Sequence, residues 1–564
     1  MPNNINLNPE QLEFLEDLEI KLGQEIDAER YNIEDGFIIS LDLTNLKLKK
    51  LPESIKSLKK LKHLNLRSCE MEEINDSIKN LNELESLDLR WNKFTTLPDI
   101  WEKFIYLKKL WLSDNHFMVS IPDSLFILAQ NNFSDRYEAQ GVNEYEAPVL
   151  GLLEILSTGH QIRKKTMNDK MDWHYTSQYR INDSGNIIGI YISSEEEDKI
   201  VVFPRQICSL KALHDLHLPE NHIRFIPNEI GNLTSLKYLN LEYNKIQNLP
   251  SSFSNLISLK TLKIGNNKLD NFPKTIVNLK SLEILELWHD NIQKIPNSME
   301  KLDSLKFLDL SSNGIEEFPL SILKIINLET LNLSNNKIPK IPHFNIDESN
   351  LKTLILDNNI IETVSESIST IKSLETLSLA YNRLSSLPDS MSELKMLRYL
   401  ELSYNSFKNL PESIIHMKSL EKLSMIENKL HILPESIIHL TSLKNLILSN
   451  NQLESLPEFL GELTSLKSLS LANNKLFKLP WSLGNLSSLK ILGLSNNQLK
   501  TLPESISNLK SLKNLSLGGN LLTDLPENMD NLTSLIFLTL SNNSFTSIPK
   551  SIDKLRNRGV KITI

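Results

Sequence analysis

The sequence predicts an α/β solenoid, a curved horseshoe with a concave parallel β-sheet of about 20 strands and a convex side of 3-10 or short helical turns. Three observations predict this class. A unit of 23 residues recurs along most of the 564-residue chain. Each unit begins with the strand pattern L-x-x-L-x-L, and each continues with the pattern L-P-x-x-I-x-x-L. The copies at 489–511 and 512–534 follow both patterns most regularly.

The first pattern alternates, so its leucines point to one side of a strand and the intervening residues point to the other. An asparagine follows most of the strands, and its amide can bond main-chain groups of its own turn and of the adjacent turn. In the second pattern apolar residues recur every three positions, which is the spacing of a helical turn. Strands stack about 4.8 Å apart, whereas the turns need more room, so the stack bends with its strands on the concave side.

The N-terminal segment, residues 1–43, is expected to form a cap and the first strand. Leu12, Leu15, Leu18 and Leu22 have helical spacing, and the first strand pattern starts at Ile38. Such a cap covers the apolar edge that the first strand would otherwise expose. Residues 44–122 then form a first block of repeats. Cys69 takes an asparagine position in this block, and we interpret it as a structural residue.

The period is lost over residues 123–192, where we expect a non-repeat insertion with helices at 124–133 and 147–158. The order of apolar and glycine positions at 153–192 resembles that at 18–43, which indicates a second copy of the N-terminal cap. Two arrangements fit this pattern. The chain contains either two capped arrays, about 1–122 and 147–564, or one solenoid with an insertion that bulges from one face.

The main array is expected to occupy residues 193–549, and residues 550–564 are expected to end it with a cap strand. From 221 to 543, asparagine follows every strand except one, where Asp290 stands. Six residues later proline recurs, and it is missing only at Ser365. This regularity predicts an unbroken ladder of strands through the main array.

The period and the two patterns resemble the leucine-rich repeat family. The L-P-x-x-I variety is similar to scaffolds that bind Ras-like GTPases, to the repeats of plant disease-resistance proteins, and to archaeal and bacterial leucine-rich repeat proteins. The resemblance implies a protein partner bound on the concave face, with a small GTPase as one candidate. One fold hosts many functions, so the resemblance does not identify the partner.

The sequence lacks G-x-x-x-x-G-K-[ST], H-E-x-x-H, C-x-x-C and G-x-S-x-G, the motifs of phosphate, zinc, redox and serine-nucleophile chemistry. We therefore predict a non-enzymatic protein with no cofactor and no metal site. A few polar and aromatic residues of the insertion could suggest a site, but we interpret them as surface and packing residues of a cap: Glu154, His160, Asp172, Trp173 and His174.

Basic residues (61) and acidic residues (70) are interleaved, and a net charge of −9 without a basic run argues against a nucleic-acid partner. We find no basic-then-apolar leader and no apolar run near the ~18 residues that span a bilayer. Cys69 and Cys208 are the two cysteines, too few for disulfide-sealed ends. These features favour a cytoplasmic protein. The alternative is a secreted or cell-surface effector or adhesin that recognises an external protein or glycan.

The partner-binding residues are expected among the outward side chains beside the strands. Beyond about residue 440 these are small and polar, as at Ser449 and Asn450, whereas many nearer the N-terminus are large. Exposed aromatic residues and arginine dominate interface energies. The predicted partner-binding residues are Arg90, Trp91, Trp111, Asp114, His116, Tyr191, His217, Glu242, Tyr243, Glu286, Trp288, His289, Tyr381 and Tyr404.

Overall fold

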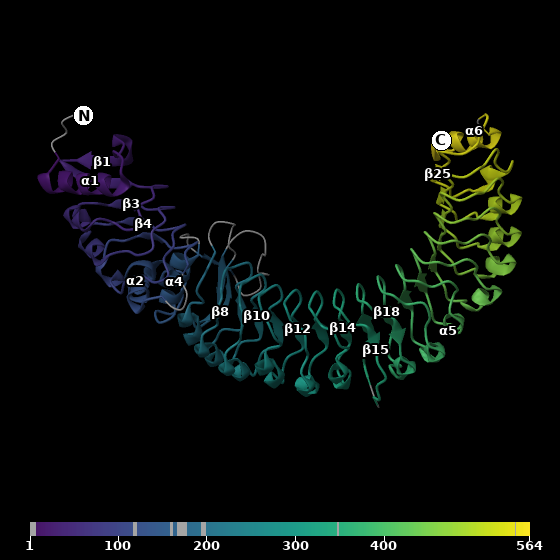
Figure 1. The fold of residues 1–564 in the computed structure, drawn as a ribbon, viewed down its shortest axis with the longest axis horizontal. Helices are drawn as coiled ribbons and strands as arrows, with labels where there is room; N and C mark the ends of the chain where they lie inside the picture. The colour runs from purple at the N-terminus through teal and green to yellow at the C-terminus, as the bar shows by residue number, and fades with distance from the viewer. Residues whose placement is uncertain are drawn as a thin grey trace. The chain divides into compact units, whose positions relative to one another are not determined.

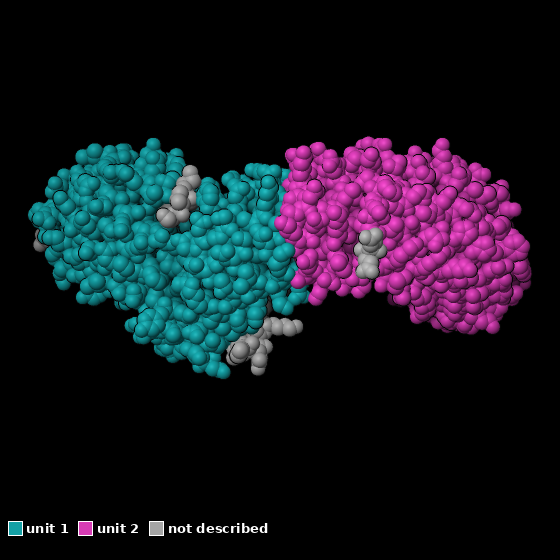
Figure 2. Space-filling model, turned by 90° about the horizontal axis from the view of Figure 1, so that it is seen from below, with its two compact units in different colours: residues 1–291 teal, residues 292–564 magenta. Residues whose placement is uncertain are grey.

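The structure is a computed structural model that describes residues 7–116, 121–157, 162–165, 177–192, 199–346, 349–547 and 549–564. The chain forms two compact units, 1–291 and 292–564, which Figure 2 shows in different colours. Each unit is described by itself. In both, short strands line one side and mainly 3-10 turns line the other (Figure 1). We name these sides the strand face and the turn face.

Unit 1 begins with helix α1 (Pro9–Leu22), which confirms the helix predicted from the leucine spacing. At its start, the Asn8 side chain accepts a hydrogen bond from the Glu10 N–H (3.1 Å), and at its end Gly23 has a φ of 68°. Phe14 and Leu18 are fully buried in the core that the helix shares with the first repeats. Helix α1 therefore covers the first repeat as a cap does.

The first ladder of unit 1 joins five strands. β1 and β2 form an antiparallel hairpin, and each later strand lies parallel to the one before it, so that Leu64 pairs with Leu87. The elements are η1 (Ala28–Arg30), β1 (Tyr31–Glu34), β2 (Phe37–Asp42), η2 (Glu53–Ser57), β3 (His63–Asn65), η3 (Asp76–Asn80), β4 (Ser86–Asp88), η4 (Trp101–Lys103) and β5 (Lys109–Trp111).

Helices replace the repeat pattern where the period is lost. α2 (Asp123–Phe133) and α4 (Ala147–Leu156) form at the predicted positions and pack against each other, with α3 (Asp135–Glu138) between them in the chain. Their approach depends on Gly151, because a Cβ there would lie 2.9 Å from the Cβ of Phe133. Leu152 and Ile155 of α4 join the core of the first ladder.

A second hairpin follows, made of β7 (Gln178–Ile181) and β8 (Ile187–Tyr191), with β6 (Arg163–Lys164) parallel to β7. Tyr179 pairs with Ile190 as Tyr31 pairs with Leu41. In each hairpin the pairing register shifts directly after the residue that follows the tyrosine. This shared register agrees with the sequence likeness between the two segments. The boundary between the compact units falls elsewhere, at 291/292 inside the regular array.

The second ladder of unit 1 continues from β8 in parallel, with partners 23 residues apart from β9 onwards. Its elements are η5 (Arg205–Ser209), β9 (Asp215–His217), η6 (Asn228–Asn232), β10 (Tyr238–Asn240), η7 (Ser251–Asn255), β11 (Thr261–Lys263), η8 (Lys274–Asn278) and β12 (Ile284–Glu286).

Unit 2 repeats this plan in one parallel ladder, beside which β15 and β17 pair with each other. Its elements are η9 (Asn297–Lys301), β13 (Phe307–Asp309), η10 (Leu320–Lys324), β14 (Thr330–Asn332), β15 (Lys340–Ile341), β16 (Thr353–Ile355), β17 (Thr363–Val364), η11 (Glu366–Thr370), β18 (Thr376–Ser378), η12 (Asp389–Glu393), β19 (Tyr399–Glu401), α5 (Glu412–Ile415), β20 (Lys422–Ser424), η13 (Glu435–His439), β21 (Asn445–Ile447), η14 (Glu458–Glu462), β22 (Ser468–Ser470), η15 (Trp481–Asn485), β23 (Ile491–Gly493), η16 (Glu504–Asn508), β24 (Asn514–Ser516), η17 (Met529–Asn531), β25 (Phe537–Thr539), α6 (Lys550–Asn557) and β26 (Lys561–Thr563).

The end of the array is confirmed in part. β26 pairs with β25 as the predicted terminal strand, but helix α6 precedes it. Pro549, Ile552 and Leu555 have the same spacing as the apolar residues of the 3-10 turns, so the sequence does not distinguish this helix from another turn.

An asparagine ladder runs beneath the strand ends. The Asn244 amide Nδ2 donates to the carbonyls of Leu218 (2.8 Å) and Leu241 (3.1 Å), and its Oδ1 accepts from the Ile223 N–H (3.0 Å). Each such asparagine therefore satisfies buried main-chain groups of its own and the preceding repeat. The predicted solenoid, with a parallel sheet on one side and 3-10 turns on the other, is confirmed.

Cys69 occupies the same place in the ladder. Its Sγ–H donates to the carbonyl of Leu43 (2.9 Å), which lies 26 residues earlier, as the amide of Asn244 does to Leu218. Burial raises the pKa of the Cys69 thiol to about 12, so the thiolate needed for reactivity is disfavoured. The structural interpretation of Cys69 is confirmed.

Candidate partner-binding surface

Three residues of each repeat point outward from the strand face, and a fourth follows them just before the ladder asparagine. In the repeat of β10 these are Tyr238, Asn240 and Glu242, and then Tyr243. The neighbouring strands pair with partners 23 residues apart, so equivalent residues of successive repeats lie side by side. Each position therefore forms a row along the unit.

The fourth position has a left-handed backbone, with φ of 55° at Tyr243 and 54° at Tyr381. Asparagine and glycine tolerate this conformation, whereas bulky side chains rarely adopt it. Asparagine or glycine indeed fills many repeats: Asn45, Asn266, Asn335, Asn358, Asn450, Asn473, Asn496, Gly519 and Asn542. Five repeats instead carry a ring: Trp91, Tyr243, His289, Tyr381 and Tyr404. Histidine also tolerates this backbone, but the backbone gives no reason for the tryptophan and the three tyrosines, which points to a role outside folding.

Arg90 and Trp111 meet in the first ladder, on neighbouring repeats. The Arg90 guanidinium pairs with the Asp88 carboxylate (Nη2–Oδ2, 2.7 Å) and lies over the Trp111 indole, 5.5 Å from the ring centroid. The ion pair and the stacking thus hold the Arg90 side chain against other residues of the same strand face. The remaining predicted residues of this ladder lie in the turns that follow the strands: Trp91, Asp114 and His116.

Tyr191 and His217 are predicted to be exposed, but only 4% and 5% of their surfaces are exposed. The His217 ring stacks on Tyr238 (centroids 4.4 Å apart, 16° between planes) and contacts Tyr191 (5.7 Å). Burial, together with the charges of Arg180 and Lys263, lowers the pKa of His217 to about 4. The three rings face outward yet shield one another, which corrects the expected exposure of Tyr191 and His217.

Glu242, Tyr243 and Trp288 form one group in the second ladder. The Trp288 indole N–H donates to Glu242 Oε1 (2.9 Å), two repeats away. The indole crosses Gly265 in the intervening repeat, where a Cβ would lie 2.6 Å from the ring. The Tyr243 ring meets the indole edge to face (centroids 5.2 Å apart, 73° between planes). Burial raises the pKa of the Glu242 carboxyl.

The other two predicted residues of this ladder flank the indole. Glu286 forms an ion pair with Lys263 (2.9 Å), and the exposed His289 has its ring centroid 6.4 Å from that of Trp288. Five predicted residues of the second ladder therefore lie together, namely Trp288 and four neighbours of its indole.

Tyr381 and Tyr404 form a stacked pair in unit 2 (centroids 4.0 Å apart, 8° between planes), which confirms the predicted pairing. Their side chains remain accessible, with 51% and 39% of the surface exposed. The same row holds Asn335 and Asn358 just before them, and the Asn358 amide donates to Asn335 Oδ1 (2.6 Å). A tyrosine stack thus replaces a side-chain hydrogen bond that the row makes elsewhere.

Sequence reasoning missed several residues of the strand face. Tyr238 covers His217, and Gly265 makes room for the indole of Trp288. Ile491 and Phe537 are exposed beyond residue 440, where small polar residues were expected. Both stand at the first outward position of a strand, so the L-x-x-L-x-L pattern could have identified them.

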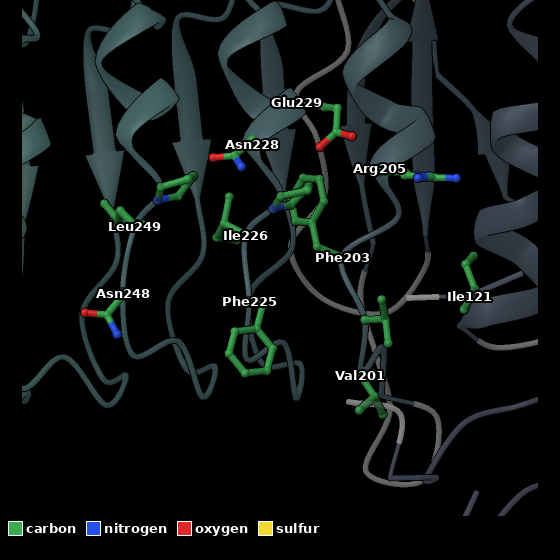
Figure 3. A pocket seen from close by; sticks show the side chains of 13 residues that line it. Ile121, Val201, Phe203, Arg205, Phe225, Ile226, Asn228, Glu229, Asn248 and Leu249 are labelled. Atoms are coloured by element: carbon green, nitrogen blue, oxygen red, sulfur yellow. The ribbon is translucent and has the colours of Figure 1, made fainter. Parts of the chain in front are cut away.

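A pocket of about 470 Å³ also escaped prediction (Figure 3). It lies in unit 1, between the start of α2 and the segments that lead into η5, η6 and η7. Most of its lining is apolar, and Phe225 stands exposed at it. Its residues come from separate repeats and from the irregular segment, so no single motif marks it: Ile121, Val201, Val202, Phe203, Arg205, Phe225, Ile226, Pro227, Asn228, Glu229, Asn248, Leu249 and Pro250.

Within the described ranges, no three or more His, Cys, Asp or Glu side chains are grouped to hold a metal. Glu154 is buried, pairs with Arg136 (2.9 Å) and accepts a hydrogen bond from the Tyr137 hydroxyl (2.8 Å), so it is a packing residue of the cap. In the same described ranges, no helix has the length and apolar character needed to cross a bilayer. Four residues considered with Glu154 lie outside the described residues: His160, Asp172, Trp173 and His174.

Family models match the chain over most of its repeats. A model described as a leucine-rich repeat region matches residues 202–305, 388–480 and 480–557. Two further leucine-rich repeat models match residues 349–407 and residues 106–134, 304–325 and 327–346. No curated protein matches the chain.

Solved structures share the fold. A leucine-rich repeat protein of Leptospira interrogans is 27% identical (TM-score 0.55), and the match covers 86% of this chain and 97% of that one. The ectodomain of the Arabidopsis thaliana membrane receptor kinase GASSHO1/SCHENGEN3, solved with CASPARIAN STRIP INTEGRITY FACTOR 2, is 26% identical (TM-score 0.55), over 94% of this chain and 59% of that one. The plant peptide hormone receptor RGFR1, solved with RGF2, is 24% identical (TM-score 0.56), over 93% and 82%.

Proposed function

This chain belongs to the leucine-rich repeat proteins, and we propose that it is a non-enzymatic scaffold that binds a protein partner on its strand face. One observation carries the proposal. Tryptophan or tyrosine occupies the left-handed fourth position of four repeats, where asparagine and glycine suit the backbone better. Strain of this kind collects at functional sites. The plant ectodomain solved with a protein factor, at 26% identity, supports a protein or peptide as the class of partner.

The exposed tryptophan and tyrosine rings are residue types that contribute strongly to the binding energy of protein interfaces. Tryptophan, tyrosine and arginine carry most interface energy, because they bury a large area at a small loss of side-chain entropy. Trp91, Tyr243, Tyr381 and Tyr404 are exposed, and Trp288 is held in place by Glu242. Partner contact is therefore assigned to these residues and to their neighbours on the strand face.

We also propose a class of partner and a cellular compartment. A small GTPase is one candidate partner, because the repeat type is similar to that of Ras-binding scaffolds, and the expected compartment is the cytoplasm. Fractionation of the native host tests the compartment: recovery mainly in the medium or the envelope would favour the secreted or surface alternative. Capture by an immobilised Ras-like GTPase tests the partner class.

Replacing both stacked tyrosines with asparagine (Y381N/Y404N) is expected to weaken partner capture while leaving stability within about 1 kcal/mol of the original. The left-handed backbone favours asparagine, and this gain offsets the lost ring stack, which contributes about 0.5–1.5 kcal/mol. The new pair would copy Asn335 and Asn358 in the same row. Affinity capture from host lysate and thermal melting measure the two effects.

The matched control is N473S/N496S, which removes a fourth-position pair in which the Asn496 amide donates to Asn473 Oδ1 (2.7 Å). This control is expected to capture the partner as the original chain does. Equal capture by Y381N/Y404N would remove the tyrosine pair from the partner surface.

A further inference from the structure

The group around Trp288 forms a preorganised corner on the strand face of unit 1. The indole lies flat across Gly265, and Tyr243 meets it at a steep angle of 73°. The indole N–H fixes the Glu242 carboxylate at the base of this corner (2.9 Å). We name the group of Glu242, Tyr243 and Trp288 the indole corner. Its two rings and one carboxylate need no rearrangement to present their surfaces together.

Among the described residues around the indole corner, one carboxylate has no ion pair of its own. Asp215 pairs with Arg180, and Glu286 pairs with Lys263 (2.9 Å). Within the described part of the chain, Glu242 has no ion pair. Burial raises the pKa of its carboxyl, and the hydrogen bond from Trp288 and the charge of Lys263 act in the opposite direction. A partly buried carboxylate next to aromatic faces is complementary to a cation that brings its own apolar stem.

The first ladder shows which side chain suits such a place. There the Asp88 carboxylate and the Trp111 indole hold Arg90, with its guanidinium 2.7 Å from the carboxylate and 5.5 Å from the ring centroid. A planar guanidinium can bond the carboxylate and stack on the indole at the same time. At the indole corner the carboxylate and the indole are both present, and none of the described arginines pairs with them.

We propose that the indole corner binds an arginine side chain of the protein partner. This inference rests on the proposed function, since it names the group that a protein would insert into the strand face. The guanidinium would bond Glu242 and stack on Trp288, as Arg90 does with Asp88 and Trp111. Gly265 acts as a positioning residue because its missing Cβ lets the indole reach Glu242.

The test uses the full chain and a short peptide with one central arginine, in parallel with the same peptide carrying citrulline. Citrulline has nearly the same shape and no charge. The readout is the indole N–H resonance of Trp288 in protein labelled at tryptophan nitrogen, assigned by its loss in W288F. The arginine peptide is expected to shift this resonance saturably, and the citrulline peptide to bind at least about tenfold more weakly.

Two variants test separately the charge of Glu242 and the position of the Trp288 indole. E242Q removes the charge with little change of shape, and G265A displaces the indole without changing any charge. Each is expected to weaken arginine-peptide binding by about tenfold or more. E458Q, at an exposed glutamate of the turn face in unit 2, is expected to change nothing. Melting curves of the variants report whether they are folded.

Equal binding of the arginine and citrulline peptides, or unchanged binding in E242Q, would overturn the inference. If E242Q does not fold, unchanged arginine-peptide binding in G265A would overturn the inference instead. The peptide experiment needs no natural partner, so its failure leaves the proposed function standing when partner capture still depends on Tyr381 and Tyr404. Partner capture that does not depend on Tyr381 and Tyr404 would remove this pair from the partner surface, whatever the peptide does.

Discussion

Replacing Asp290 with asparagine is expected to stabilise the protein at pH 8 by up to about 4 kcal/mol and by almost nothing at pH 4. Asp290 occupies an asparagine position of the ladder and is only 8% exposed. Its Oδ1 accepts from the N–H groups of Asn267 (3.2 Å) and Leu269 (3.1 Å), as the asparagine oxygens do. Its Oδ2 is buried and has no hydrogen-bond partner among the described residues.

The position of Oδ2 explains why D290N is expected to stabilise the protein at high pH. Where Oδ2 lies, a ladder asparagine has an amide that donates to carbonyl oxygens, and a carboxyl can donate there only when it is protonated. Burial therefore raises the pKa of Asp290 to about 7 from an ordinary value of 3.8, against the effect of its two main-chain hydrogen bonds. Between these values the folded state holds more protons than the unfolded state, so stability falls as pH rises through that window.

Urea unfolding of the original chain and of D290N, each from pH 4 to pH 8.5, measures this effect. The difference between the two curves isolates Asp290 from all other titrating groups. No charged side chain contributes to its pKa among the described residues, and the nearby Lys268 and His289 are exposed. A constant difference across the pH range would mean that Asp290 does not titrate there.

Replacing the ladder residue Asn474 with alanine is expected to destabilise the protein by about 2–4 kcal/mol. The Asn474 side chain accepts from the Leu453 N–H (3.0 Å) and donates to the carbonyls of Leu448 (3.0 Å) and Leu471 (3.0 Å). Alanine leaves the buried Leu453 N–H without this partner, which costs about 1–3 kcal/mol. The carbonyls of Leu448 and Leu471 each lose one of two donors, because Asn451 (3.1 Å) and Asn497 (2.9 Å) still donate to them. The loss should appear as lower hydrogen-exchange protection in the repeats next to Asn474.

The neighbouring Asn473 provides the control. It is exposed, it stands at the left-handed fourth position, and its side chain makes one exposed hydrogen bond with Asn496. N473G keeps a residue that suits the backbone, so its effect should stay within about 1 kcal/mol. Similar losses in N474A and N473G would contradict the ladder's contribution to stability.

The regular parts of the fold could be predicted because the leucines and the asparagine of each repeat each have one structural role. Alternating leucines require a buried strand side, and the asparagine requires main-chain groups to bond. These tasks recur every 23 residues, so strands, turns and ladder follow from a single repeat. The second hairpin could also be predicted, because Tyr179 and Ile190 stand in the same order as Tyr31 and Leu41.

The candidate surface could be predicted only in outline. The sequence shows which side chains point outward, but their exposure depends on neighbours in adjacent repeats and on side-chain rotamers. For example, the rings of Tyr191 and His217 contact each other, and His217 also stacks on Tyr238 of the next repeat. The contact between Trp288 and Glu242 depends on an indole that spans two repeats over Gly265, and no local pattern specifies that rotamer.

The left-handed row also fixes distances along a unit. Its members are one strand spacing apart, about 4.8 Å. A partner in polyproline II conformation advances about 3.1 Å per residue and has three residues per turn, so every third side chain points to the same side. Tyr243 and His289 are two repeats apart, so such a partner would meet them with side chains three residues apart. We expect an alanine scan of a bound segment to show a period of three.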